Sequence, residues 1–97
     1  MLRQMAERTP GDPFPQYGLA MELRKRGAND DAVAAFTVLA ERHPGYVPAY
    51  LMCGNLLREL GRLPEATLVY DRGIAAATAA GDHHAAGELE SARAELA

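Results

Sequence analysis

The residues of this chain that are capable of catalysis are few. Cys53 is the only cysteine, and a cysteine nucleophile needs a base such as histidine beside it to form the thiolate. Cys53 instead falls on the small, inward side of a predicted helix, where a cysteine behaves as a small apolar residue. Asp30 and Asp31 form an acidic pair, but at a helix start their capping and dipole interactions suffice as an explanation. Because motifs such as Gly-x-Ser-x-Gly and His-Glu-x-x-His are also absent, we predict that the chain is not an enzyme.

His83, His84 and Glu88 are the candidates for a metal site. His84 and Glu88 are four residues apart and would share one face of a helix. A structural zinc site usually needs four ligands, and a catalytic one needs three and a water. An exposed helix that begins with Asp82 as its cap explains these residues more simply, so we predict no metal and no cofactor.

Three basic residues, Arg24, Lys25 and Arg58, form a candidate patch for a partner. The alternative is that they are solvated charges on amphipathic helices, partly paired with Glu22 and Glu59. The chain has ten Lys and Arg, thirteen Asp and Glu, and a formal net charge of −3. A nucleic-acid binder needs concentrated positive charge to neutralise phosphates, so this class is excluded.

The length and composition of the chain are those of a small globular protein. Its 97 residues suffice for one domain, over residues 1–97. No apolar run approaches the roughly 20 residues that span a bilayer, so no membrane partner is expected. The first residues carry charges without an apolar core, unlike a signal peptide. A single cysteine allows no internal disulfide, and together these features predict a cytoplasmic protein.

The sequence repeats itself after 34 residues. Small residues coincide with small residues, glycine with glycine, and aromatic with aromatic. The matching pairs are Ala20 and Gly54, Leu23 and Leu57, Gly27 and Gly61, Ala32 and Ala66, and Phe36 and Tyr70.

Each repeat is predicted to form two helices separated by a glycine. The first helix ends at Gly27, because glycine adopts the left-handed conformation that satisfies the last carbonyls of a helix. Asn29, Asp30 and Asp31 are expected to supply capping oxygens for the second. That helix ends at the turn His43-Pro44-Gly45, because proline cannot continue it.

The second repeat follows the same plan and leads into a fifth helix. Gly61 ends its first helix, and Pro64 lies near the start of the next, where its missing N–H costs nothing. This helix is predicted to continue to about Ala80. Gly81 and Asp82 then stop it and cap a last helix over 82–96, with Leu89, Ala92 and Leu96 at helical spacing.

The recurring small residues indicate close helix packing. Two helices approach closely only where one presents little side chain. We therefore expect Ala20 and Gly54 to form notches in the first helices, with Ala32 and Ala66 as their counterparts in the second. Phe36 and Tyr70 would fill the space beside the notches.

These residues resemble the tetratricopeptide repeat family, whose pattern is Trp-x2-Leu-Gly-x2-Tyr, Ala-x3-Phe and Pro. The second repeat has Tyr50-x2-Cys53-Gly54-x2-Leu57 and Ala66-x3-Tyr70. The first has Gln16-x2-Leu19-Ala20-x2-Leu23, Ala32-x3-Phe36 and Pro44. The resemblance implies an all-α fold, a right-handed superhelical array of antiparallel helix pairs. Its two repeats would cover 13–46 and 47–80, and the last helix, 82–96, would be a solvent-facing cap.

The resemblance also implies a concave groove, lined by the first helix of each repeat, that binds a peptide or helix of another protein. Some relatives hold a C-terminal carboxylate with a lysine and asparagines; Asn55 matches one such position, but Tyr17, Met21 and Leu51 occupy others. The implied groove residues are Phe14, Tyr17, Met21, Arg24, Lys25, Leu51, Asn55 and Arg58, with Glu59 beside them.

Two functions follow from the sequence. The first is an interaction scaffold whose groove binds an acidic or amphipathic segment. The second is a structural or self-assembling subunit that uses the exposed ends of the array. About three repeats are usually needed to bury a stable core, so we predict a weak homodimer or a monomer of modest stability. Residues 1–9, with Leu2, Met5 and Ala6, are expected to add a helical turn over the first repeat.

Overall fold

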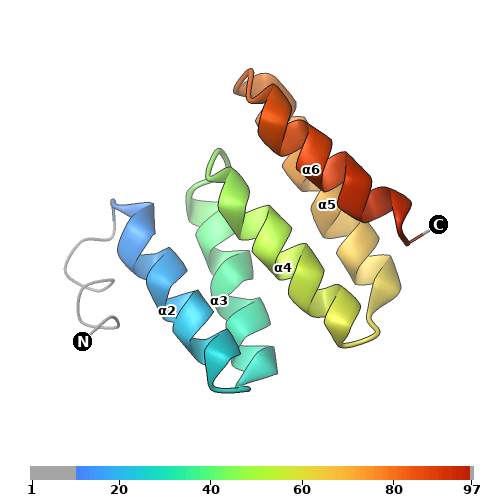
Figure 1. The fold of residues 1–97 in the computed structure, drawn as a ribbon. Coiled ribbons are helices and arrows are strands. Elements are labelled where there is room, and N and C mark those ends of the chain that lie inside the picture. The colour runs from blue at the N-terminus through green and yellow to red at the C-terminus, as the bar shows by residue number, and fades with distance from the viewer. Residues whose placement is uncertain (1–10, 97) are drawn as a thin grey trace.

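A computed structural model describes residues 11–96, which form five helices and no strand. Neighbouring helices run antiparallel (Figure 1), so α2 pairs with α3 and α4 with α5. The all-α array of helix pairs is therefore confirmed, whereas the turn expected in residues 1–9 lies outside the described residues. The helices are α2 (Pro13–Lys25), α3 (Asn29–Arg42), α4 (Val47–Glu59), α5 (Leu63–Ala79) and α6 (His83–Ala94).

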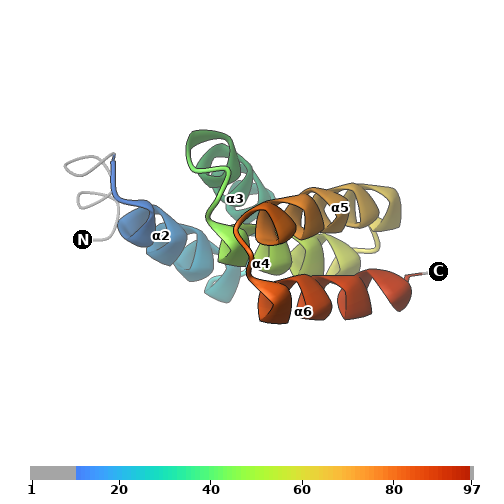
Figure 2. The same cartoon turned by 90° about the horizontal axis from the view of Figure 1, so that it is seen from above.

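The helices form two layers. Viewed from above, α3 and α5 lie on one side, and α2, α4 and α6 lie on the other (Figure 2). The central helix α4 contacts α3, α5 and α6, and seven of its 13 residues are buried. None of the described helices is long and apolar enough to cross a membrane.

Three glycines end helices as predicted. Gly27, Gly61 and Gly81 have φ angles of 80°, 76° and 70°, in the left-handed region that side chains disfavour. The residue after each glycine donates its N–H to the carbonyl five residues earlier in the chain; for example, the Ala28 nitrogen lies 2.9 Å from the Leu23 oxygen. This hydrogen bond satisfies a carbonyl at the helix end, as in a Schellman motif.

The predicted capping of α3 is wrong. Its N-cap is Ala28, which offers no side-chain hydrogen bond, so Asn29 already lies inside the helix. Asp30 and Asp31 occupy the first turn, where their charge still interacts favourably with the helix dipole. Because α3 begins directly after the turn that ends α2, residue 28 rather than Asn29 takes the cap position. By contrast, Asp82 caps α6 as predicted, its Oδ1 accepting from the Ala85 N–H at 3.1 Å.

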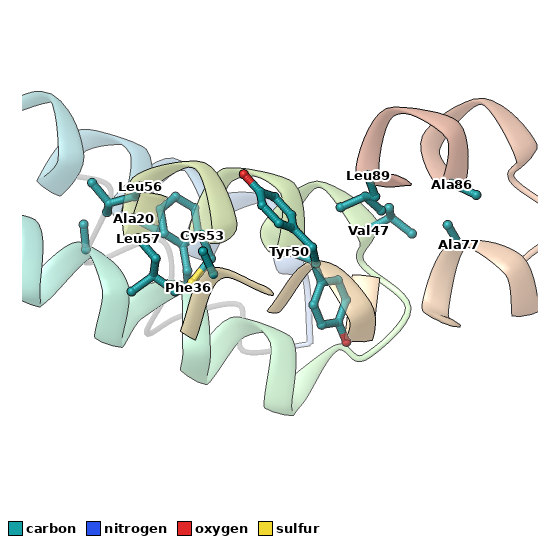
Figure 3. Packing of buried hydrophobic residues seen from close by; sticks show 13 residues of the cluster. Ala20, Phe36, Val47, Tyr50, Cys53, Leu56, Leu57, Ala77, Ala86 and Leu89 are labelled. Carbon is teal, nitrogen blue, oxygen red and sulfur yellow. The ribbon is translucent and has the colours of Figure 1, made fainter. Parts of the chain in front are cut away.

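The residues of the expected notches lie in the core, of which Figure 3 labels Ala20 and Phe36. Ala20, Ala32, Ala66, Phe36 and Tyr70 are fully buried. A Cβ atom added to Gly54 would lie only 2.4 Å from Cε1 of Tyr70, so α4 and α5 approach this closely because residue 54 lacks a side chain.

The last helix departs from the strict repeat. Helices α2 and α4 begin at Pro13 and Val47, the predicted starts of the two repeats, although the repeat limits themselves stay a prediction. Helix α5 has 17 residues where α3 has 14, so α6 begins only at His83. Helix α6 also ends at Ala94, and Leu96 lies in the turn that follows.

Candidate partner-binding groove

An open groove of about 810 Å³ lies between α4 and α6. Helix α4 contributes Leu51, Asn55 and Arg58, whose spacing of four and three residues places them on one face. These are three of the predicted groove residues. The full lining is Leu51, Met52, Asn55, Arg58, His83, His84, Gly87, Glu88, Ser91, Ala92 and Glu95.

The arginines of the predicted basic patch are paired with glutamates of neighbouring helices. Arg58 of α4 lies 2.6 Å from Glu95, just after α6, and Arg24 of α2 lies 2.7 Å from Glu59 of α4. Glu22 pairs with Arg26 rather than with Arg24. The arginines therefore link the helices of one layer, and a partner carboxylate has to compete with a glutamate for each of them.

The predicted residues of α2 do not line this groove, although Nη1 of Arg24 lies 3.6 Å from the sulfur of Met52, which does. Met21, Arg24 and Lys25 line a shallow hollow on α2 together with Gly18 and Glu22. Lys25 is exposed and forms no ion pair with another described residue.

Two aromatic residues of α2 have different surroundings. The ring of Tyr17 packs edge-on against Phe36 and Tyr46, with centroids 6.2 Å and 5.5 Å apart. Burial raises the pKa of the Tyr17 hydroxyl, against the opposing effect of the Arg24 charge. Phe14, by contrast, is 68% exposed and lies outside the residues that line the groove and the hollow. Tyr17 therefore supports the core, and Phe14 faces solvent.

Asn55 joins the groove to the core. Its Oδ1 accepts a hydrogen bond of 2.6 Å from the Tyr70 hydroxyl. Burial raises the pKa of that hydroxyl, while Arg58 opposes the shift, so Tyr70 remains a neutral donor. Since the amide nitrogen carries two further N–H donors, Asn55 is able to hold Tyr70 and to donate into the groove at the same time.

Helix α6, expected as a solvent-facing cap, also forms one wall of the groove, which the sequence did not indicate. Leu89 of α6 is fully buried, and Arg93 forms an ion pair with Asp71 of α5, so this helix packs firmly on the second repeat. Its other face presents His84, Glu88 and Glu95 to the groove. Because α5 is longer than α3, α6 begins later in the sequence than a 34-residue repeat predicts. Adding 34 to the numbers of the α4 groove residues would therefore not have identified most of the α6 residues that line the groove.

Of the residues considered for catalysis or metal binding, Cys53 is buried and His84 is exposed. Burial raises the pKa of the Cys53 thiol to about 11, because it outweighs the Thr37 hydrogen bond and the Arg62 charge. His84 lies 3.0 Å from Glu88 on the surface of α6. Within residues 11–96, no group of three or more His, Cys, Asp or Glu is placed to hold a metal ion.

Comparison with known proteins identifies the family. A sequence profile described as the tetratricopeptide repeat matches residues 23–86. The chain belongs to the tetratricopeptide repeat family. A solution NMR structure of a tetratricopeptide repeat domain protein from Salinibacter ruber is 36% identical, with a TM-score of 0.84 over 90% of this chain and 88% of that one. A crystal structure of such a protein from the same organism is 35% identical, with a TM-score of 0.80 over 88% of this chain and 94% of the other.

The tetratricopeptide repeat chain also resembles part of a longer protein. It is 37% identical over 82 residues to an uncharacterized protein of Rhizobium meliloti (strain 1021). That match covers 84% of this chain but only 19% of the relative, so the chain spans about a fifth of its length. The tetratricopeptide repeat fold commonly mediates protein–protein interaction, and it typically serves as a scaffold rather than as a catalyst.

Proposed function

We propose that this protein is an interaction scaffold whose groove between α4 and α6 binds an amphipathic segment of a partner protein. The observation that carries the proposal is the composition of the groove. Leu51, Met52 and Ala92 supply apolar surface, while Asn55 and Arg58 supply donors, along one open channel. A segment with one apolar face and hydrogen-bonding groups beside it complements this surface.

The glycine in α6 supports the same proposal. A Cβ atom added to Gly87 would meet no atom within 4 Å, and the residue lies inside a helix, where glycine is unfavourable. Neither packing nor backbone conformation within the described residues therefore requires glycine at this position. In the groove, it leaves room for a partner's backbone or side chain to approach α6.

The test of the groove uses two leucine substitutions in the same helix. Gly87→Leu places a large side chain in the groove, and Glu90→Leu adds the same side chain outside the residues that line it. Both proteins should stay folded, because position 87 has free space and position 90 is exposed. Tyr17→Ala is unsuitable because it would remove a core contact.

The measurement begins with capture of partners from a lysate of the native cell by the wild-type protein. Calorimetric titration with the purified partner then gives its affinity for each variant. We expect Gly87→Leu to weaken binding at least about tenfold, the loss of one well-packed contact, and Glu90→Leu to leave it unchanged. Equal binding by both variants would place the interface elsewhere and contradict the proposal.

A second candidate function is self-assembly or a structural role through the ends of the array. The observation behind it is Phe14, which is 68% exposed at the start of the first described helix and therefore accessible to an end-to-end contact. Sedimentation across a hundredfold concentration range should then show a weak dimer that Phe14→Ser converts to a monomer. A constant monomer mass for the wild type would remove this candidate.

A further inference from the structure

A second concave site lies on the opposite side of α4 from the groove. It is a pocket of about 200 Å³ between α3 and α5, with α4 as its floor. Its α4 residues, Ala49 and Cys53, are about half a turn from Asn55 and Arg58 at the roughly 100° per residue of an α-helix. The pocket is lined by Phe36, Thr37, Ala40, Glu41, Ala49, Tyr50, Cys53, Val69 and Arg72.

The second repeat carries a larger residue than alanine at the position that corresponds to Ala40. The residue 34 positions after Ala40 is Ile74, which packs partly buried against the core. The chain therefore accepts a large aliphatic side chain at this position of the second helix in a repeat. With alanine in the first repeat, the space beside α3 stays open, and the neighbouring side chains lose packing contacts.

The floor of the pocket is apolar and uncharged. Phe36 and Ala49 are fully buried, and Tyr50 and Cys53 are 8% and 4% exposed. Burial also raises the pKa of the Cys53 thiol to about 11, which keeps it neutral at physiological pH. A cavity of about 150 Å³ lined by apolar side chains is large enough to bind benzene, so this floor has room for a group of that size.

The rim of the pocket carries two opposite charges. Glu41 of α3 and Arg72 of α5 are exposed, and neither forms an ion pair with another described residue. Most other arginines among the described residues pair with a carboxylate, including Arg24, Arg58 and Arg93. A carboxylate and a guanidinium are thus both available above an apolar floor.

We propose that this pocket binds a free amino acid with a large apolar side chain, which fills the floor while Arg72 binds its carboxylate and Glu41 its ammonium group. A guanidinium matches a carboxylate with two parallel hydrogen bonds, which an ammonium group cannot offer. The size of the pocket argues for so small a ligand, because pockets for drug-sized molecules and cofactors span about 300–1,000 Å³. This site is independent of the groove and of the partner proposed for it.

The test is an NMR titration of the isotope-labelled full chain with L-phenylalanine. Phenylacetate lacks the ammonium group, phenethylamine lacks the carboxylate, and L-alanine lacks the apolar side chain. We expect saturable chemical-shift changes at the pocket residues. Phenylalanine should bind about tenfold or more tightly than phenylacetate, phenethylamine or L-alanine, because each of these lacks one charged hydrogen bond or the buried side chain.

Three substitutions locate the ligand. Ala40→Ile introduces the residue that the second repeat already carries and should abolish binding, whereas Ala34→Ile, on an exposed part of α3, should retain it. Arg72→Gln should weaken phenylalanine and phenylacetate but not phenethylamine, and Glu41→Gln should weaken phenylalanine and phenethylamine but not phenylacetate. The two rim residues are exposed, so these variants keep the test valid if Ala40→Ile folds poorly.

Several outcomes would overturn the proposal. Absence of saturable shifts would remove the site, and binding that survives both Ala40→Ile and Arg72→Gln would place the ligand elsewhere. Equal affinity for phenylalanine, phenylacetate and phenethylamine would remove the role of the rim charges. Tighter binding of N-acetyl-phenylalanine amide than of phenylalanine would indicate that the pocket takes a side chain from within a partner protein instead of a free amino acid.

Discussion

Replacing Gly54 with alanine should push α4 and α5 apart. The added Cβ would lie 2.4, 2.6 and 2.9 Å from three ring carbons of Tyr70, well inside the 3.5–4.0 Å at which carbon atoms pack favourably. The ring has little freedom to retreat, because it is fully buried and its hydroxyl bonds Asn55 at 2.6 Å.

Two opposing effects set the magnitude. Overpacking a tight core costs about 1–3 kcal/mol, while alanine improves on glycine inside a helix by about 1 kcal/mol. Gly87→Ala in α6 is the matched control, since its Cβ would meet no atom within 4 Å and only the second effect applies. Both variants gain the same helix propensity from alanine, so this gain does not contribute to the difference between them. The Gly54→Ala protein should therefore be about 1–3 kcal/mol less stable than the Gly87→Ala protein.

Urea unfolding followed by circular dichroism measures this difference, because a domain of this size is expected to unfold in one cooperative step. Gly87→Ala should be more stable than the wild type. A double variant, Gly54→Ala with Tyr70→Phe, should recover part of the loss, because a ring without its hydrogen bond to Asn55 can shift. Equal stability of the Gly54→Ala and Gly87→Ala proteins would refute the packing argument.

Three further predictions concern stability. Gly73→Ala should destabilise the protein and speed hydrogen exchange in α6, because the new Cβ would lie 2.7 Å from Cβ of Tyr50 and 3.0 Å from a methyl of Leu89. The buried Cys53 thiol should contribute stability that is fully present below its ordinary pKa of 9.0 and is lost as pH rises through about 11. Between these two pH values, the urea midpoint of the Cys53→Ala protein should therefore fall less than that of the wild type. Arg58→Ala should lower the free energy of unfolding by less than about 1 kcal/mol, because its ion pair with a carboxylate is largely solvated, and a larger loss would show that the pair supports the fold.

The fold was predictable because its signals are local and repeated. Gly27 and Gly61 end helices through their own backbone conformation, and the 34-residue shift shows that each stop occurs in the same context. The contact of Gly54 with Tyr70 was predictable for the same reason, since small and large residues recur together. The cap at Ala28 was missed because alanine has no capping side chain, whereas Asp30 and Asp31 offered capping oxygens close by in sequence.

The site was less predictable because it depends on which charged groups meet when long side chains extend from one helix to the next. Arg24 pairs with Glu59 and Arg58 with Glu95, partners that are 35 and 37 residues away in sequence. A helical pattern shows which face a residue occupies but not which charge on the next helix lies within reach. The contribution of α6 was also hidden, because the longer α5 breaks the period that had located every other element.

The position of α4 allows the groove and the pocket to be tested separately. Ala40 lines the pocket from α3 and Gly87 lines the groove from α6, and α4 lies between them with seven of its 13 residues buried. Substitutions without shared contacts usually have additive effects, so Ala40→Ile should leave partner binding in the groove unchanged, and Gly87→Leu should leave phenylalanine binding unchanged. If Ala40→Ile instead altered the affinity for the partner, α4 would have to shift as a body between its neighbours. The ion pairs of α4 with α2 and with the residue after α6 would then be the contacts that such a shift rearranges.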